Sequence, residues 1–264
     1  MTRPSLSWRA LLTGAILPLI LAGGAFAAGA PQVIGIAAAV VNDVRIRAST
    51  AAQPLPAVVR QRVALGNQVQ TGGASRLQLQ LLDRSAFTVG ANARLTIDRF
   101  VYDPAGSSMT ATVAKGAFRF MSGRSGSRGS SITTPVASIG IRGTILDGVV
   151  GPLAVEIARG ERGIGQAVEA DPETATLVIL RGPGAGREGN ATVGAVSVTA
   201  AGATVDLAEP LQAAYVPRPG AVPIGPFTIS LPGLARLNET ILPPQQPLLP
   251  ADGSGSGDFV PGGD

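Results

Sequence analysis

Apolar and polar residues alternate with a period of two in several short runs between residues 33 and 216. Leu77, Leu79 and Leu81 alternate with Gln78 and Gln80 in the clearest of these runs. The same alternation recurs in Leu95/Ile97, Met109/Ala111/Val113, Phe118/Phe120 and Leu153/Val155/Ile157. A period of two puts one set of side chains on a buried face and the other set toward water, as in a β-strand. The pattern therefore predicts a series of short strands.

Turn-forming residues separate these runs about every ten residues, a spacing typical of all-β architecture. The separators are Asp83–Ser85, Gly90–Asn92, Asp103–Gly106, Lys115–Gly116 and Ser122–Gly123. No window after residue 27 keeps an apolar period of 3.6 together with helix-capping signals. We therefore expect an all-β fold, an elongated sandwich-like or solenoid-like arrangement of short strands, with almost no helix.

The first 27 residues have the features of a secretory signal peptide. Arg3 and Arg9 precede an apolar run from Ala10 to Phe26, and small residues stand at Ala25 and Ala27. This order predicts cleavage after Ala27 and export to the periplasm. The alternative is a retained membrane anchor, but glycines and a proline interrupt the run, which falls short of the roughly 20 apolar residues of a spanning helix. We expect no stable transmembrane anchor.

The rest of the chain divides by composition into three parts. Residues 33–150 are predicted to form a β domain, and residues 151–216 either continue that unit or form a small second one. Ten prolines fall within residues 217–264. Because proline removes backbone donors and the glycines there add chain entropy, we expect this tail to be disordered.

The composition argues against most catalytic chemistry. The chain has no Cys and no His, which excludes disulfides, thiol nucleophiles, the commonest general base and the commonest zinc ligand. Asp98, Asp103 and Asp147 could supply the carboxylate pair of a glycosidase, but acids that cap turns are the preferred interpretation. We expect no catalytic, metal or cofactor site.

The charge of the chain does not indicate a nucleic-acid partner. Removing Arg3 and Arg9 with the leader lowers the formal net charge from +4 to +2. Nucleic-acid binding needs clustered excess positive charge, so we expect no such partner.

Several phrases in a fixed order carry a family resemblance. They are Val63–Gly72, Ser75–Ser85, Phe87–Gly90, Leu95–Pro104, Lys115–Phe120 and Ile132–Thr144. The order of these phrases resembles the FecR family, and the closing TTPVASIGIRGT is the most specific piece. The resemblance covers about 90 residues, from about Val58 to Gly148.

The resemblance implies an all-β periplasmic domain with a role in signalling. In the best understood members this domain passes a signal from an outer-membrane transporter to a sigma regulator at the inner membrane. Those members have a cytoplasmic helical region and one transmembrane helix before the domain. Only nine residues precede the apolar run here, so a direct anti-sigma role is expected only if residues 1–27 are retained.

The candidate interaction residues are basic and lie in a stretch without acids between Asp103 and Asp147. They are Lys115, Arg119, Arg124, Arg128 and Arg142. Arg142 either presents a fixed guanidinium to a partner carboxylate or glycan phosphate, or pairs internally with Asp83, Asp98 or Asp147, the interpretation that we favour. The loop with Arg124 and Arg128 either meets anionic head groups and wall polymers or is simply solvated.

The sequence therefore predicts a non-enzymatic periplasmic FecR-domain protein that acts as an envelope interaction or signalling module. Its expected partner is an envelope protein. The alternatives are a module that binds peptidoglycan or another wall glycan, a structural module, and a membrane-anchored sigma-factor regulator. A hydrolase ranks last.

Overall fold

The computed structural model describes residues 30–103, 107–123, 129–164, 168–183 and 194–241. The chain divides into Met1–Ala30 and a second unit from Pro31 to Asp264. The predicted signal peptide lies outside the described residues, as do the candidate residues Arg124 and Arg128. All the described strands and helices belong to the second unit.

The strands of the second unit join into one mixed sheet that does not close, and this sheet folds into two layers. The helix-covered layer runs β4 (Arg62–Ala64), β1 (Val33–Val41), β6 (Arg76–Leu81), β7 (Ala86–Val89), β9 (Ser108–Met121), β12 (Thr144–Val150), β13 (Thr176–Pro183), β16 (Gln212–Val216) and β17 (Ile224–Thr228). The bare layer runs β3 (Leu55–Pro56), β2 (Val44–Arg47), β5 (Gln68–Thr71), β8 (Arg94–Val101), β9, β10 (Ser130–Thr133), β11 (Ser138–Arg142), β14 (Ala195–Ala200) and β15 (Ala203–Leu207). The predicted all-β class is confirmed.

Strand β9 belongs to both layers. Its first half pairs with β8 and β10, and its second half pairs with β7 and β12. The change falls at Gly116, whose φ is 87°. A Cβ at this position would collide with Ala93, so the turn between the layers requires glycine here.

The main core lies between the two layers. Leu77 and Leu79 of β6 face it from one layer, and Leu95 and Ile97 of β8 face it from the other. Phe118 and Phe120 are also fully buried. The predicted alternation is confirmed at these strands. The apolar side chains face the core because burying apolar surface is the dominant favourable term in folding.

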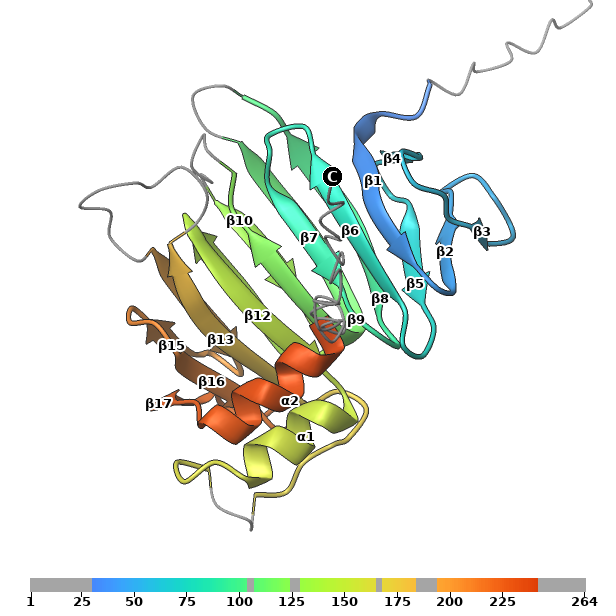
Figure 1. The fold of residues 1–264 in the computed structure, drawn as a ribbon. Coiled ribbons are helices and arrows are strands. Elements are labelled where there is room, and N and C mark those ends of the chain that lie inside the picture. The colour runs from blue at the N-terminus through green and yellow to red at the C-terminus, as the bar shows by residue number, and fades with distance from the viewer. Residues whose placement is uncertain (1–29, 104–106, 124–128, 165–167, 184–193, 242–264) are drawn as a thin grey trace, which may run out of the picture. The chain divides into compact units, whose positions relative to one another are not determined.

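Two helices, α1 (Pro152–Arg159) and α2 (Leu231–Ile241), cover the outer face of β12, β13 and β16 (Figure 1). They close a second core in which Ile157 and Leu237 lie in one cluster with Leu177 and Tyr215. Among the described residues, neither helix is long and apolar enough to cross a membrane.

The strand predicted at Leu153–Ile157 is wrong, because these residues form α1. Leu153, Val155 and Ile157 satisfy a period of two, but the buried side chains also include Ala154 and Ala158. Buried residues at i, i+1, i+3 and i+4 mark a helix face. Pro152 supports the helix start, where its missing N–H costs nothing.

The disordered tail predicted from Pro217 begins too early, because β17 and α2 lie within it. Pro226 sits in β17, which pairs only with β16 among the described strands, and an edge strand tolerates proline. Pro232 occupies the first turn of α2, where no intrahelical donor is lost. Residues 242–264 of the predicted tail lie outside the described residues.

Residues 151–216 add strands to both layers. β13 pairs with β12 in the helix-covered layer, and β14 pairs with β11 in the bare layer. These pairings, together with α1, make the segment an extension of the two layers that begin at residue 33.

Candidate functional site

The outer face of the helix-covered layer changes from apolar to polar where the helices end. One cross-strand row runs from β16 to β6 through Ala213, Ile179, Asp147, Arg119, Thr88 and Gln78. Ala213 and Ile179 are buried in the second core. The part of this face on β6 and β7 lies beyond α1 and α2 (Figure 1) and presents polar side chains.

At this border two arginines flank one buried carboxylate, and we call Arg119, Asp147 and Arg181 the Arg-Asp-Arg cluster. Arg119 Nε donates to Asp147 Oδ1 at 2.6 Å, and an Nη donates to Oδ2 at 2.8 Å. Arg181 Nε lies 3.5 Å from Asp147 Oδ2. The Asp147 side chain is 0% exposed, and each arginine side chain is 22% exposed.

The cluster has more donors than its acid can accept. Hydrogen bonding to Asp147 raises the pKa of Arg119 above its ordinary value, so this guanidinium is fixed in its charged form. Within the part of the chain that the structure describes, Arg181 makes only the long ion pair, and its buried Nη1 has no hydrogen-bond partner there. An unsatisfied buried donor costs free energy. The cluster therefore carries one uncompensated positive charge and suits a second carboxylate or another anion.

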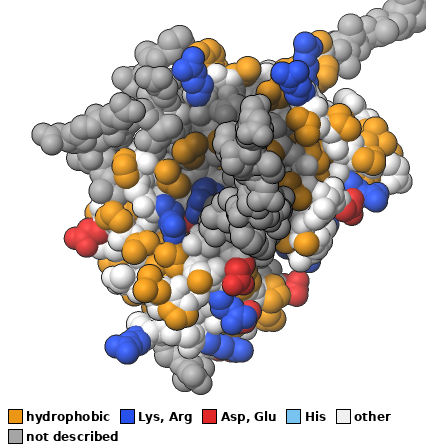
Figure 2. Space-filling view, in the orientation of Figure 1, with side chains coloured by type: hydrophobic (Ala, Val, Ile, Leu, Met, Phe, Trp, Pro, Cys, Tyr) orange, Lys and Arg blue, Asp and Glu red, His pale blue; other side chains and the backbone are white. Residues whose placement is uncertain are grey.

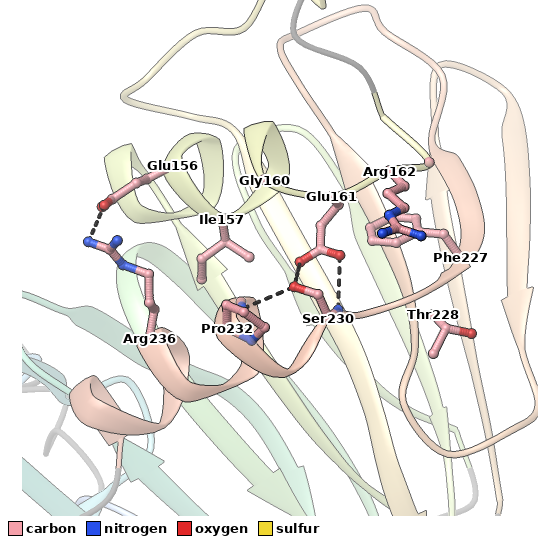
Figure 3. Close-up of a pocket in the computed structure, with 12 residues that line it drawn as sticks. Glu156, Ile157, Gly160, Glu161, Arg162, Phe227, Thr228, Ser230, Pro232 and Arg236 are labelled. Carbon is pink, nitrogen blue, oxygen red and sulfur yellow. Dashed lines mark hydrogen bonds and ion pairs between the residues drawn. The ribbon is translucent and has the colours of Figure 1, made fainter.

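A cavity of about 740 Å³ lies where α1, α2 and β17 meet (Figure 3). Two pairs of polar side chains in its lining are bound to each other. Glu161, only 5% exposed, accepts the backbone N–H of Ser230 at 2.9 Å and the Ser230 hydroxyl at 2.8 Å. Arg236 pairs with Glu156 across the same cavity.

Ser230 caps the N-terminus of α2. Its Oγ accepts the N–H of Gly233 at 3.2 Å, which satisfies one of the four free donors at a helix start. The Glu161 carboxylate adds negative charge at the positive end of the helix dipole. A Cβ at Gly233 would collide with Glu161. This cavity is therefore a joint between the helices rather than an open binding site.

The structure distributes the predicted interaction residues over both layers. Arg119 belongs to the cluster, whereas Lys115 is exposed at the bend of β9. Arg142 is exposed on β11 of the bare layer, and it forms no ion pair with any of the described residues. The structure therefore does not bring Lys115, Arg119 and Arg142 together.

The internal ion pair predicted for Arg142 is wrong, because each candidate acid has another partner. Asp147 binds Arg119, Asp83 accepts the hydroxyl and the N–H of Ser85, and Asp98 accepts the hydroxyl of Thr112. β12 faces β9, whereas β11 faces β10 and β14. Which acid an arginine can reach depends on which strands pair, and the spacing of residues along the sequence does not reveal that pairing.

Sequence reasoning missed Arg181. It follows the apolar run Leu177–Leu180 of β13 and stands two residues after Ile179, so both side chains share a face. A charged residue directly after an apolar strand segment was the signal that could have identified Arg181 as a candidate.

The residues of the closing TTPVASIGIRGT phrase are mainly structural. Ile139 and Ile141 are buried in the main core. Thr134 Oγ1 accepts the N–H of Ala137 at 3.1 Å and fixes the turn between β10 and β11. Thr144 exchanges backbone hydrogen bonds with the Ser122 hydroxyl at 3.0 and 3.1 Å. These contacts position β12 and, with it, Asp147.

Residues 67–161 match the family model described as FecR protein, so the chain carries a FecR domain. This match confirms the predicted resemblance. It begins at β5 and ends just after α1. The matched segment supplies Arg119 and Asp147, whereas Arg181 lies beyond it.

Two solved structures are similar to this chain, and both are described as a "putative anti-sigma factor" from Parabacteroides distasonis ATCC 8503. The identities are 12% and 13%, and each TM-score is 0.41. Each comparison covers 61% of this chain and 60% of the other, which is less than two thirds of its length. No curated protein matches the sequence. The FecR domain points to a signalling or regulatory role.

Proposed function

We propose that this protein is a non-enzymatic, periplasmic interaction module that signals by binding an envelope protein at the Arg-Asp-Arg cluster. The observation that carries the proposal is the excess of guanidinium groups over carboxylates on a polar sheet face beside the helices. The FecR domain supports a regulatory role, and the predicted signal peptide supports the location.

The cluster has the physical properties of a prepared carboxylate receptor. Asp147 holds Arg119 through two hydrogen bonds, and its second oxygen also attracts Arg181. Side chains that are already ordered lose less conformational entropy when a ligand binds. The exposed part of the Arg181 guanidinium can then donate a charge-assisted hydrogen bond to an Asp or Glu side chain of the partner.

The non-enzymatic part of the proposal is supported by how the polar groups are used. The Ser230 hydroxyl donates to Glu161 and accepts the N–H of Gly233, so both side chains serve to cap α2. Among the described residues no group of three or more potential metal ligands is found. The partner is therefore expected to be captured and not converted.

Site-specific photocrosslinking in cells tests the proposal. A photoreactive residue at Gln78 probes the polar face, and one at Thr112 probes the bare layer as a matched control. We expect an envelope protein to be trapped at position 78 and not at 112. Arg181→Gln should reduce this adduct about tenfold or more, since a charge-assisted hydrogen bond contributes roughly 1.5–3 kcal/mol.

Two controls separate the interpretations. Arg142→Gln changes an exposed arginine on the other layer and should leave the adduct at position 78 unchanged. Equal trapping at positions 78 and 112, or an adduct that survives Arg181→Gln, would contradict the assigned site. Peptidoglycan fragments alone would replace the protein partner with a wall glycan.

A further inference from the structure

A second surface, distant in sequence from the Arg-Asp-Arg cluster, exposes apolar side chains on the segment that follows β2. Leu55, Val58 and Val59 are 65%, 62% and 55% exposed. Figure 2 shows hydrophobic side chains gathered at the margin of the molecule that carries β2 and β3 in Figure 1. Apolar groups gathered on a surface usually mark an interaction site.

The turn that displays Val58 and Val59 is held in one conformation. The backbone N–H of Gln61 bonds to Val58 O at 3.1 Å, and the Gln61 side chain accepts the N–H of Val58 at 3.0 Å. Two further bonds tie the turn to Ala37 of β1, through Arg60 N at 2.8 Å and Gln61 O at 2.9 Å. Exposure of the valines is therefore a property of an ordered turn.

Arg60 adopts an unfavourable backbone conformation at the corner of this turn. Its φ is 69°, in the left-handed region that residues with a Cβ rarely occupy. Such an outlier persists only where the surroundings impose it, and it is a reason to look for a function. Here it places a basic side chain directly beside two exposed valines.

The turn is also locally basic. Arg60 and Arg62 are both exposed, and neither guanidinium forms an ion pair or hydrogen bond with any of the described residues. Asp43 is the sole acid between residues 31 and 82, and it pairs with Arg45 at 3.1 Å. This surface therefore combines exposed aliphatic side chains with neighbouring arginines that have no acidic partner among the described residues.

We propose that Leu55 and the Val58–Arg62 turn form a contact with an anionic lipid bilayer. Leu55, Val58 and Val59 enter the boundary between head groups and acyl chains, while Arg60 and Arg62 bind lipid phosphates. Peripheral membrane proteins bind in this way, because burial of apolar area and attraction to anionic lipids both contribute to their affinity.

A bilayer fits this surface better than an acidic protein does. Protein hot spots are enriched in Trp, Tyr and Arg and centre on well-packed pockets, whereas the turn projects small aliphatic side chains and contains no aromatic residue. A bilayer needs no complementary shape. Each arginine near an anionic leaflet contributes about 1 kcal/mol, which corresponds to about fivefold in affinity.

Vesicle flotation of residues 28–264 tests the proposal, since the second unit contains both cores and the predicted leader is absent. The vesicles contain phosphatidylcholine alone or equal parts of phosphatidylcholine and phosphatidylglycerol. We expect binding to the anionic vesicles, weakened at high salt. Leu55→Ser/Val58→Ser/Val59→Ser should abolish it, and Arg60→Gln/Arg62→Gln should weaken it about 25-fold.

Matched variants make the outcome specific. Val222→Ser removes a valine that is 53% exposed elsewhere, and Arg142→Gln removes an exposed arginine of the bare layer; both should bind vesicles like the unmodified chain. Equal binding to both kinds of vesicle, or no binding to either, overturns the proposal. Loss of a protein adduct in the triple serine variant without any vesicle binding would assign the turn to a protein partner instead. Arg181→Gln should leave vesicle binding intact, so failure here is distinguishable from failure of the proposed function.

Discussion

Replacing Asp147 by asparagine removes the one acid that holds Arg119 and Arg181 together. The substitution keeps the size of the side chain but leaves two neighbouring guanidiniums without their counter-charge. Breaking a buried ion pair by deleting one partner costs about 3–5 kcal/mol. Both arginines keep part of their surface in water, with 22% of each side chain exposed, so we expect a loss near the lower limit, about 3 kcal/mol.

Urea unfolding of residues 28–264 measures this loss. The sole tryptophan is Trp8, within the predicted leader, so far-ultraviolet circular dichroism is the appropriate probe. Glu156→Gln is the matched control, because it breaks an ion pair whose side chains are 50% and 55% exposed. Exposed pairs contribute less than about 1 kcal/mol. Arg181→Gln should also cost less than about 1 kcal/mol, because Arg119 still satisfies both oxygens of Asp147.

A result in which Asp147→Asn destabilises no more than Glu156→Gln would refute this reasoning. It would mean that the cluster is effectively solvated and that Arg181 is not held in place. A large loss for Arg181→Gln would also count against it, because the variant could then no longer separate partner binding from stability.

Two further predictions concern the joint between the helices and the second core. Gly233→Ala should destabilise the protein by about 1–3 kcal/mol, because its Cβ would collide with Glu161 at the cap of α2. The control is Gly73→Ala, whose Cβ would meet nothing closer than 4.0 Å. This variant should change stability by less than about 0.5 kcal/mol in the same urea experiment. Burial raises the pKa of Tyr215 to about 12, above its value of about 10 in an unfolded chain. The stability that this residue contributes is therefore complete below pH 10 and is lost as the pH rises toward 12. Tyr215→Phe should flatten the dependence in that window, and an unchanged pH profile would show that the phenol is accessible to water.

The strands were predictable wherever one face is core and the other is polar. β6 and the first half of β9 show this, because their Leu, Met and Val side chains face the main core while Gln and Thr face outward. The prediction failed at α1, where Ala154 and Ala158 were too small to stand out and the larger residues mimic a strand. It also failed at β17 and α2, where Pro226 and Pro232 were interpreted as breakers although each occupies a position that tolerates proline.

The candidate site could be predicted only in part. Arg119 was identified from the absence of nearby acids in the sequence, yet its partner Asp147 lies 28 residues away and reaches it through the register of β9 with β12. Arg181 arrives from a third strand. Pairing between strands that are far apart in sequence is settled by the whole sheet, so no local pattern reveals which charges meet.

The length of the family-matched segment has a consequence for excising it. Residues 67–161 would retain β5 to β12 and α1 but would lose the neighbours of four strands. β5, β6, β11 and β12 would each expose an edge that β2, β1, β14 and β13 cover in the intact chain. Uncovered edges are templates for association with other chains. The family-matched segment is thus shorter than the segment needed to cover these edges, because residues 33–200 are the shortest stretch that contains β1, β2, β13 and β14.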